Sequence, residues 1–170
     1  MLACYFAPFI KALAIIINSR IKHKIRSPLD DHPSGYGGES LWADKISENT
    51  YQLKNIPIFA YGVNFDDVVL VKEDEEGVLQ VIEKVESSNH HTIRVFFVDE
   101  QSGDSNFSRL KQFKGEGIGS EKWNDDLYAL NVTPTRDYEE FIEVLNHQQD
   151  LGVIEYELAG EWSGGFDGSE

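Results

Sequence analysis

The sequence predicts an α+β fold, and three features of the chain support this prediction. Strand-like segments follow one another through the first half, whereas strands alternate with two helical patterns in the second half. With 170 residues, of which 41% are hydrophobic and 26% charged, the chain has the size and composition of one globular domain. We therefore expect a bent antiparallel sheet or partial barrel, followed by a β-α-β-α-β half with two helices packed on one sheet face.

The first half contains four segments that favour strands. Apolar and β-branched residues, in part alternating with polar ones, mark residues 41–46, 51–58, 67–72 and 78–85. A tight turn is expected between the first two segments, and residues 74–77 close a hairpin between the last two. Because Pro57 cannot donate a backbone hydrogen bond, the end of the second strand is expected at an edge or a bulge.

The second half combines three strands with two helices. The strands are expected at residues 91–99, 127–133 and 153–159. The first helix is indicated by apolar residues spaced three apart, which end before Gly115. The second begins with a capping box made by Asp137 and Glu140, and Gly152 is a suitable end for it. Its apolar face consists of Tyr138, Phe141, Ile142 and Leu145.

Charge is distributed unevenly along the chain. Residues 1–26 contain five of the 15 Lys and Arg residues and no acid, so they carry +5. The other ten bases and all 30 acids give residues 27–170 a charge of −20. Pro, Gly, Ser and Asp follow the basic segment, which is typical of a linker. We expect a basic hydrophobic extension at 1–26, a linker at 27–39, a single domain at 40–162 and a loose tail at 163–170.

The N-terminal segment leaves two localisations open. Its apolar run, from Leu2 to Ile17, is shorter than the roughly 20 residues of a membrane-spanning helix and is interrupted by Pro8 and Lys11. Its positive residues follow the apolar run, whereas a secretory signal has them before it. We expect a cytoplasmic protein in which this segment is an accessory extension. The alternative is membrane association through residues 1–26, as a weak signal anchor or on an anionic surface.

Composition and motifs argue against several functional classes. The formal net charge of −15 argues against nonspecific nucleic-acid binding, which requires cations that neutralise phosphates. Cys4 is the only cysteine, so an intrachain disulfide and a cysteine-rich zinc site are excluded. The sequence contains no nucleophile elbow, zinc-protease motif or phosphate-binding loop. We accordingly expect no catalytic residue, no metal and no cofactor.

Several motifs occur in the order found in a known family. They are ESLWADKISENTYQLKNIPIFAYGVNFDDVVLV, NHHTIRVFF, LYALNVTP, DYEEF and GVIEYE, and they cover about residues 39–160. In these motifs the chain resembles the bacterial domain-of-unknown-function family numbered 4265. The resemblance implies an α+β fold in a soluble bacterial protein without an established activity. The chain departs from the family pattern at Asp66 and Asn89, where the family has Gly, and at His91, where it has Ser.

His90, Thr92 and Arg94 form the most suggestive polar cluster of the sequence. Because they alternate along one predicted strand, their side chains share a face. Histidine exchanges protons near neutral pH, and arginine binds carboxylates or phosphates with two parallel hydrogen bonds, so an anion is the expected ligand. The alternative, which the surplus of acids favours, is that Arg94 pairs with a cross-strand Glu and that His90 ends the strand at a turn.

Asp67 is a further candidate ligand-binding residue. Together with Asp66 it could hold a hard cation. Neighbouring residues of a strand point to opposite faces, however, so the two carboxylates would not act as a simple acid–base pair. We favour a hydrogen-bonded turn in which Asp67 accepts from backbone N–H groups.

Tyr61 belongs to an aromatic loop with Phe59 and Phe65. Such a loop either contacts a partner or fills the core, and we favour the core. Of the tryptophans, we expect Trp42 in the core and Trp123 on the surface.

Two functional classes are compatible with these patterns. The first is a non-enzymatic binding module that engages a basic protein, such as an immunity-like inhibitor or an adaptor, because an acidic surface speeds encounter with a cationic one. The second is a small enzyme or anion-binding domain that uses His90, Thr92 and Arg94, with Asp67 or Tyr61, and that needs a pocket gathering these groups. We favour the first class; the oligomeric state is left open.

Overall fold

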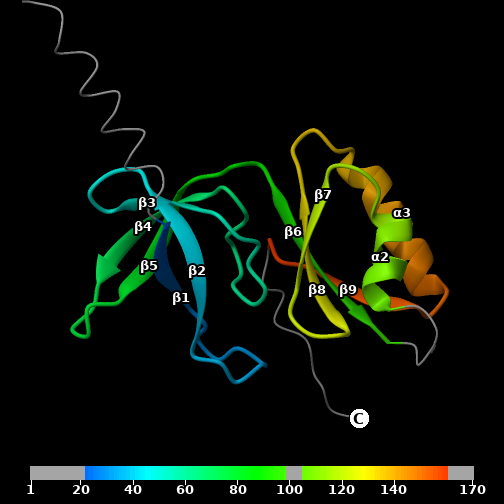
Figure 1. The fold of residues 1–170 in the computed structure, drawn as a ribbon, viewed down its shortest axis with the longest axis horizontal. Coiled ribbons are helices and arrows are strands. Elements are labelled where there is room, and N and C mark those ends of the chain that lie inside the picture. Colours follow the sequence, from blue (N-terminus) through cyan, green and yellow to red (C-terminus); the bar gives the residue numbers. More distant parts are fainter. Residues whose placement is uncertain (1–21, 99–104, 161–170) are drawn as a thin grey trace, which may run out of the picture.

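The computed structural model describes residues 22–98 and 105–160. They form a closed five-stranded barrel, made from the first half, and a four-stranded sheet with two helices, made from the second half (Figure 1). The predicted α+β class is confirmed, and the expected partial barrel is closed. The apolar run of residues 2–17 and the expected tail at 163–170 lie outside the described residues. Within the described ranges, no helix is long and apolar enough to cross a membrane.

The barrel is built in chain order from β1 (Lys22–Pro28), β2 (Gly38–Lys45), β3 (Thr50–Leu53), β4 (Val68–Glu73) and β5 (Leu79–Glu86). Neighbouring strands are antiparallel, except that β1 meets β5 in parallel, with Arg26 opposite Gln80. Apolar side chains at alternate positions, among them Leu41 and Val69, point inward and are buried. This alternation is what gives the barrel its core.

Strand β1 corrects the predicted start of the fold. The basic extension was expected to end at residue 26 and the domain to begin at residue 40, but β1 pairs with β2 along its whole length. Its bases alternate with inward residues, and Ile25 is only 1% exposed in the barrel core. A strand with a charged outer face therefore resembles a basic run when its sequence is read without its partner strand.

Two further predictions in the first half are wrong. The strand expected at 51–58 ends at Leu53, and residues 54–67 form a loop. Trp42 was expected in the core but is 49% exposed, because its neighbours Leu41 and Ala43 occupy the inward positions of β2. Trp123 is exposed to the same extent, as expected.

The second half forms a sheet of order β7-β8-β6-β9 with both helices on one face (Figure 1). Leu110, Phe141 and Leu145 of the helices pack with inward residues of the strands, so the predicted arrangement is confirmed. Asp137 caps the second helix by accepting from the backbone N–H of Glu140. The elements are β6 (His91–Phe97), α2 (Asn106–Lys114), β7 (Ile118–Lys122), β8 (Leu127–Val132), α3 (Tyr138–Asp150) and β9 (Ile154–Leu158). Strand β7 was not predicted.

The loop of residues 54–67 joins the barrel to the sheet face opposite the helices. Ile56 and Ile58 pack against Ala129 of β8 in a small apolar cluster. The backbone N–H of Gly62 donates to the carbonyl of Ala159 just after β9, at 3.0 Å. The junction loop, as residues 54–67 are called below, therefore carries barrel-side residues onto the sheet and borders the candidate site.

Candidate functional site

Two half-buried carboxylates, Glu39 and Glu121, shape the junction loop. Glu39 of β2 accepts hydrogen bonds from the consecutive backbone N–H groups of Ile58, Phe59 and Ala60, at 2.7–2.9 Å. Glu121 of β7 accepts from the N–H of Ile56 at 2.9 Å. In a strand, these backbone N–H groups would donate to a neighbouring strand. Here they donate to side-chain carboxylates instead, which explains why this apolar segment is not a strand. These two acids serve the fold.

Arg94 fastens the junction loop to the sheet. Its guanidinium donates to the backbone carbonyls of Ile58 and Ala60, and the side chain is almost fully buried. It also pairs with Glu157, the residue directly opposite on β9, at 3.2 Å. Its remaining face lies on the ring of Tyr61, 4.2 Å from the ring centroid. The cross-strand Glu pairing considered from the sequence is confirmed.

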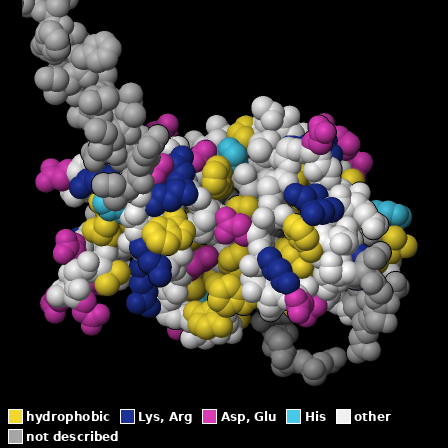
Figure 2. Space-filling view, in the orientation of Figure 1, with side chains coloured by type: hydrophobic (Ala, Val, Ile, Leu, Met, Phe, Trp, Pro, Cys, Tyr) yellow, Lys and Arg dark blue, Asp and Glu magenta, His cyan; other side chains and the backbone are white. Residues whose placement is uncertain are grey.

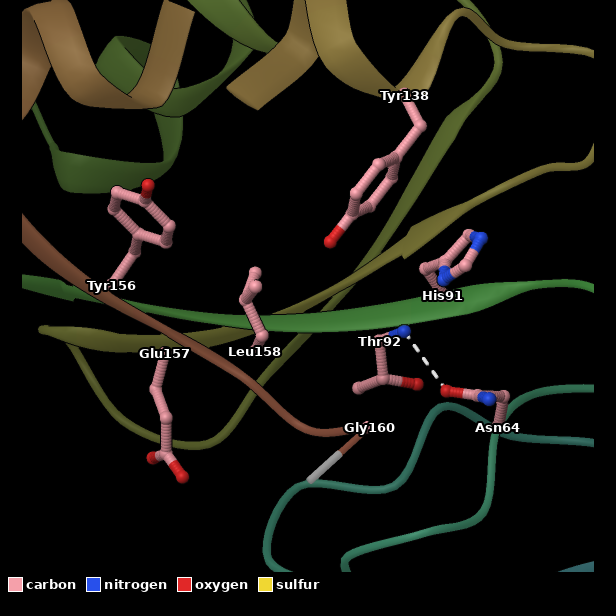
Figure 3. Close-up of a pocket in the computed structure, with 8 residues that line it drawn as sticks. All are labelled: Asn64, His91, Thr92, Tyr138, Tyr156, Glu157, Leu158 and Gly160. Atoms are coloured by element: carbon pink, nitrogen blue, oxygen red, sulfur yellow. Dashed lines mark hydrogen bonds between the residues drawn. The ribbon is translucent and has the colours of Figure 1, made fainter. Parts of the chain in front are cut away.

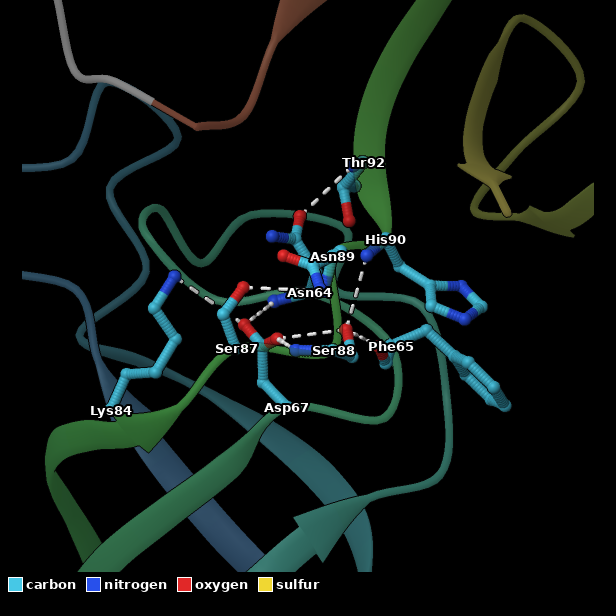
Figure 4. A network of polar contacts seen from close by, with 9 residues as sticks. All are labelled: Asn64, Phe65, Asp67, Lys84, Ser87, Ser88, Asn89, His90 and Thr92. Atoms are coloured by element: carbon cyan, nitrogen blue, oxygen red, sulfur yellow. Dashed lines mark hydrogen bonds and ion pairs between the residues drawn. The ribbon is translucent and has the colours of Figure 1, made fainter. Parts of the chain in front are cut away.

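Asp67 organises a second polar cluster at the barrel end of the junction loop (Figure 4). Its carboxylate is fully buried and accepts from the backbone N–H groups of Asn64 and Ser88, at 2.8 and 2.7 Å, and from the Ser88 hydroxyl. Lys84 lies 3.5 Å away and supplies a positive charge. The predicted hydrogen-bonded turn is confirmed. Asp66 instead pairs with Lys54, so the two neighbouring carboxylates face different partners.

His90 and Thr92 are connected to this cluster (Figure 4). The N–H of His90 donates to the Ser88 hydroxyl, and the N–H of Thr92 donates to the side chain of Asn64. The ring of His90 donates from Nδ1 to Asn131 at 2.8 Å. The five candidate residues therefore fall into two groups. Asp67, His90 and Thr92 belong to one network, whereas Arg94 and Tyr61 lie together beside the junction loop.

Arg94 and Tyr61 line a groove of about 320 Å³ between the barrel and the sheet. Most of its wall is apolar, and Glu155 and Glu157 of β9 border it. The lining residues are His32, Pro33, Phe59, Tyr61, Arg94, Phe96, Leu127, Glu155, Tyr156 and Glu157. We call this site the junction groove. Only Tyr61 and Arg94 were singled out as ligand-binding residues from the sequence, since the others come from an expected linker, three strands and a loop.

Aromatic rings form one wall of the junction groove and continue beyond it. The ring of Phe59 is 5.7 Å from that of His32, 5.3 Å from Tyr36 and 4.9 Å from Trp123. Tyr36 and Trp123 are half exposed, so this band reaches the surface. Figure 2 shows hydrophobic side chains gathered on the surface between the two halves of the molecule. The aromatic loop is therefore neither wholly core nor wholly surface.

In the junction groove, the uncharged forms of the His32 and Tyr61 rings are favoured, and these rings stand beside the carboxylates of Glu155 and Glu157. Burial lowers the pKa of His32, and the positive charge of Arg94 lowers it further. The imidazole is consequently neutral at pH 7. Burial and a hydrogen bond to Glu157 raise the pKa of Tyr61 to about 12. The charge available to a ligand in the groove is therefore negative, because Arg94, the one cation among the described residues that line it, is engaged by the junction loop, Glu157 and Tyr61.

A second hollow, of about 480 Å³, lies at the end of β9 (Figure 3). Thr92 lines it and is 2% exposed, and its hydroxyl has no hydrogen-bond partner within the described ranges. The ring of His91 at the start of β6 lies against that of Tyr138 at the start of α3, with 4.4 Å between centroids. The lining residues are Asn64, His91, Thr92, Tyr138, Tyr156, Glu157, Leu158 and Gly160. In the described part of the chain, no group of three or more His, Cys, Asp or Glu is placed to hold a metal.

Comparison with known proteins decides the family. Residues 39–156 match a family described as a domain of unknown function, DUF4265. The chain belongs to DUF4265. No curated protein matches it. The DUF4265 chain is also similar to a solved structure described as a novel crystal structure of a hypothetical protein from Neisseria gonorrhoeae. That structure is 18% identical, with a TM-score of 0.68 over 82% of this chain and 95% of that chain, and it supports the fold.

The structure explains two departures from the DUF4265 pattern. Asp66 and Asn89 stand where the pattern has Gly, and both have left-handed backbone conformations, with φ of 64° and 59°. Glycine adopts this region without steric cost, and Asp and Asn are the other residues that visit it most readily. The replacements therefore preserve the turns on either side of the Asp67 cluster.

Proposed function

We propose that this DUF4265 domain is a non-enzymatic binding module that holds a basic segment of a partner protein in the junction groove. The observation that carries the proposal is the composition of the groove, in which aromatic and aliphatic walls stand beside the carboxylates of Glu155 and Glu157. Inhibition of a basic, toxin-like protein and recruitment by an adaptor are both activities that such a module would support.

A lysine or arginine side chain matches both parts of this lining. Its methylene stem packs on apolar walls while its charged end reaches a carboxylate. The rings of Phe59 and Tyr61 add cation–π attraction for the charged group. Glu155 is exposed and Glu157 is half exposed, so both can accept from a bound cation.

The charge of the whole body supports the same class of partner. Residues 22–170, which include the basic strand β1, hold 13 bases and 30 acids and so carry −17, and Figure 2 shows acidic side chains on the rim of both halves. A field of this sign attracts basic proteins over about 8 Å at physiological salt and accelerates their association. The resulting complex is expected to weaken as the salt concentration rises.

Anion-binding chemistry receives less support from the geometry. The guanidinium of Arg94 is used by two carbonyls, Glu157 and the Tyr61 ring, and Asp67 is used by backbone donors. Arg94 lines the junction groove, whereas His90 lines neither the junction groove nor the hollow at the end of β9. A hydrogen-bonded acid–base pair poised toward one cavity, which an enzyme of this type requires, is not formed by these residues.

The experiment that tests the proposal has two steps. The full chain is first used to capture partners from its native cells at low and at high salt, and a basic protein lost at high salt is purified. Calorimetry then compares its binding to the native chain, Glu155→Gln and Glu143→Gln. Glu143 is exposed on α3, away from the junction groove, and controls for charge alone. We expect Glu155→Gln to weaken binding about three- to tenfold, as for a partly exposed ion pair.

Two results would contradict the proposal. If no basic protein binds the full chain directly, the class of partner is wrong. If Glu143→Gln weakens binding as much as Glu155→Gln, the junction groove is not the site of contact.

A second candidate function is a small-ligand site in the hollow at the end of β9. The buried, unpartnered hydroxyl of Thr92 favours it, because such groups in native proteins usually have a partner. A screen of small polar ring compounds by ligand-observed NMR tests this function. Binding by the native chain that is lost in Thr92→Val supports it, and a screen without binders to the native chain opposes it.

A further inference from the structure

We propose that β9 is a docking edge, to which the basic partner adds an extended strand in which Lys or Arg alternates with apolar residues. The inference rests on the proposed function and specifies how the partner binds. It combines three features of β9, namely an open edge, a row of hollows and a charge pattern.

Strand β9 lies at the edge of its sheet. Among residues 22–98 and 105–160, it pairs with β6 on one side and with no strand on the other. The hydrogen bonds at its two ends show which residues of β9 direct their backbone groups toward β6. The N–H of Ala159 donates to the carbonyl of Thr92, and the N–H of Val98 donates to the carbonyl of Val153. The odd-numbered residues of the strand therefore bond toward β6.

The even-numbered residues of β9 point their backbone groups toward the open edge. They are Ile154, Tyr156 and Leu158, and each has one N–H and one C=O directed away from β6. Leu158 is 43% exposed, so the edge is accessible at its end. Proline and lysine, which often protect edges, are not present in β9. An extended peptide can consequently pair with this edge through its main chain.

Three hollows are lined in part by residues of β9, and they lie on both faces of the sheet next to this edge. One of about 470 Å³ lies beside Ile154, and the hollow of about 480 Å³ lies beside Leu158 (Figure 3). The junction groove lies between them in sequence, at Glu155 and Glu157, on the barrel side. Side chains of an added strand alternate between the two faces. The hollows are thus placed to receive successive side chains of that strand.

The charges of β9 select a basic strand over a second copy of the chain. Antiparallel pairing of two β9 strands about Tyr156 would place Glu155 of one copy opposite Glu157 of the other. Like charges in direct opposition destabilise a strand pair, whereas opposite charges stabilise it. A Lys or Arg on the barrel face would lie beside these carboxylates, and an apolar residue on the other face would lie beside Ile154, Tyr156 or Leu158.

The experiment uses the full chain labelled with ¹⁵N and the acetylated, amidated peptide KVKVKVK as probe. The peptide VKKKKVV has the same composition without alternation, and EVEVEVE has the opposite charge. Leu158→Pro removes one outward N–H but no hydrogen bond to β6, and Leu158→Ala is its matched control, since it shortens the side chain and keeps the N–H. We expect KVKVKVK to shift the amide signals of residues 154–158 and Leu158→Pro to bind it at least tenfold more weakly than Leu158→Ala.

A modified peptide keeps the proposal testable if Leu158→Pro does not fold. In an extended KVKVKVK, the N–H groups of alternate residues point to the same edge of the strand. N-methylation of one alternate set removes the donors that face β9, and N-methylation of the other set leaves those donors in place. We expect one methylated peptide to lose binding and the other to keep it.

Each outcome decides the proposal. Three results would overturn strand addition at β9. The two Leu158 variants could bind KVKVKVK equally well, or the two methylated peptides could bind the native chain equally well. The native chain could also bind VKKKKVV as tightly as KVKVKVK. Absence of KVKVKVK binding by the native chain overturns it as well. The proposed function is judged separately, by the effect of Glu155→Gln on the purified basic partner. Strong binding of EVEVEVE would overturn the preference for a basic strand and leave docking at the edge in place.

Discussion

Glu157 lies directly opposite Arg94 in the register of β6 and β9, and the two side chains are paired at 3.2 Å. Their environments differ, because the side chain of Arg94 is 7% exposed and that of Glu157 is 42% exposed. The buried cation is held by two backbone carbonyls of the junction loop, whereas the carboxylate reaches the junction groove. One ion pair therefore connects the fold, through Arg94, to a surface available to a partner, through Glu157.

Substitutions at Arg94 and Glu157 are expected to have unequal effects on stability. Arg94→Lys keeps the charge but cannot reproduce the fork that reaches both Ile58 and Ala60, so at least one of these two buried carbonyls loses its donor. We expect a loss of about 2–4 kcal/mol in the free energy of unfolding. Glu157→Gln removes a half-exposed partner and should cost about 0–1 kcal/mol. Urea unfolding measures both values, and similar losses would show that Arg94 does not hold the junction loop.

Asp67→Asn is expected to destabilise the barrel end of the junction loop. The carboxylate is fully buried and accepts three hydrogen bonds from Asn64 and Ser88, and an amide nitrogen at one of its positions would face a donor. We expect a loss of about 2–3 kcal/mol in the free energy of unfolding.

The matched control for Asp67 is its neighbour, Asp66. Asp66→Asn weakens one partly exposed ion pair to Lys54 and should cost about 0–1 kcal/mol. Thermal unfolding followed by circular dichroism compares the two variants. If both have the same midpoint, the network around Asp67 contributes nothing beyond an ordinary surface charge.

Sequence patterns predict those parts of the fold whose determining residues all lie in one short segment of the chain. The capping box at Asp137, the apolar face of α3 and the hairpin of β4 and β5 are of this kind, and each is observed. Strands β1 and β7 were missed because their partners supply the signal. In β1 one buried Ile25 stands among bases, and β7 contains Gly119, which lies opposite Asn131 of β8.

The candidate site was predicted less well than the fold, for a spatial reason. Because side chains alternate along a strand, the strand predicted at 153–159 would be enough to place Glu155 and Glu157 on one face, where they lie in β9. This alternation contains no information that His32 and Phe59, far apart in the chain and outside regular strands, meet beside that face. The conformation of the junction loop, which brings Phe59 there, depends on the side chains of Glu39 and Arg94, which contact the loop from two different strands.

The left-handed backbone at Asn89 predicts an order of stability among substitutions. Gly has no Cβ and adopts a φ of 59° without steric cost, whereas Ala in this region is strained by about 1 kcal/mol or more. Asn89→Gly should therefore be about as stable as the native chain, and Asn89→Ala should lose about 1 kcal/mol in the free energy of unfolding. Urea unfolding of the two variants tests this order. Equal stability of the Ala and Gly variants would contradict the strain argument.

Tyr61 is expected to make stability fall at alkaline pH. Burial first, and a hydrogen bond to Glu157 second, raise its pKa from 10.0 to about 12. An unfolded chain loses this proton near the lower value, and the folded protein near the higher one. Between them the folded protein binds more protons than the unfolded chain, so the free energy of unfolding falls as pH rises from about 10 to about 12. Below pH 10 the contribution is fully present.

Tyr61→Phe isolates this contribution, because phenylalanine keeps the ring beside Arg94 and removes the titrating group. Burial also raises the pKa values of Tyr128, Tyr138 and Tyr156, so the native chain alone would not separate Tyr61 from them. We expect urea unfolding at pH 8, 10 and 11 to show a shallower decline of stability in Tyr61→Phe than in the native chain. Absorbance at 295 nm should show the loss of one late-titrating tyrosine in the variant. If the free energy of unfolding falls equally with pH in both proteins, Tyr61 is in ordinary contact with solvent. Such a result would also contradict the hydrogen bond between Tyr61 and Glu157 in the junction groove.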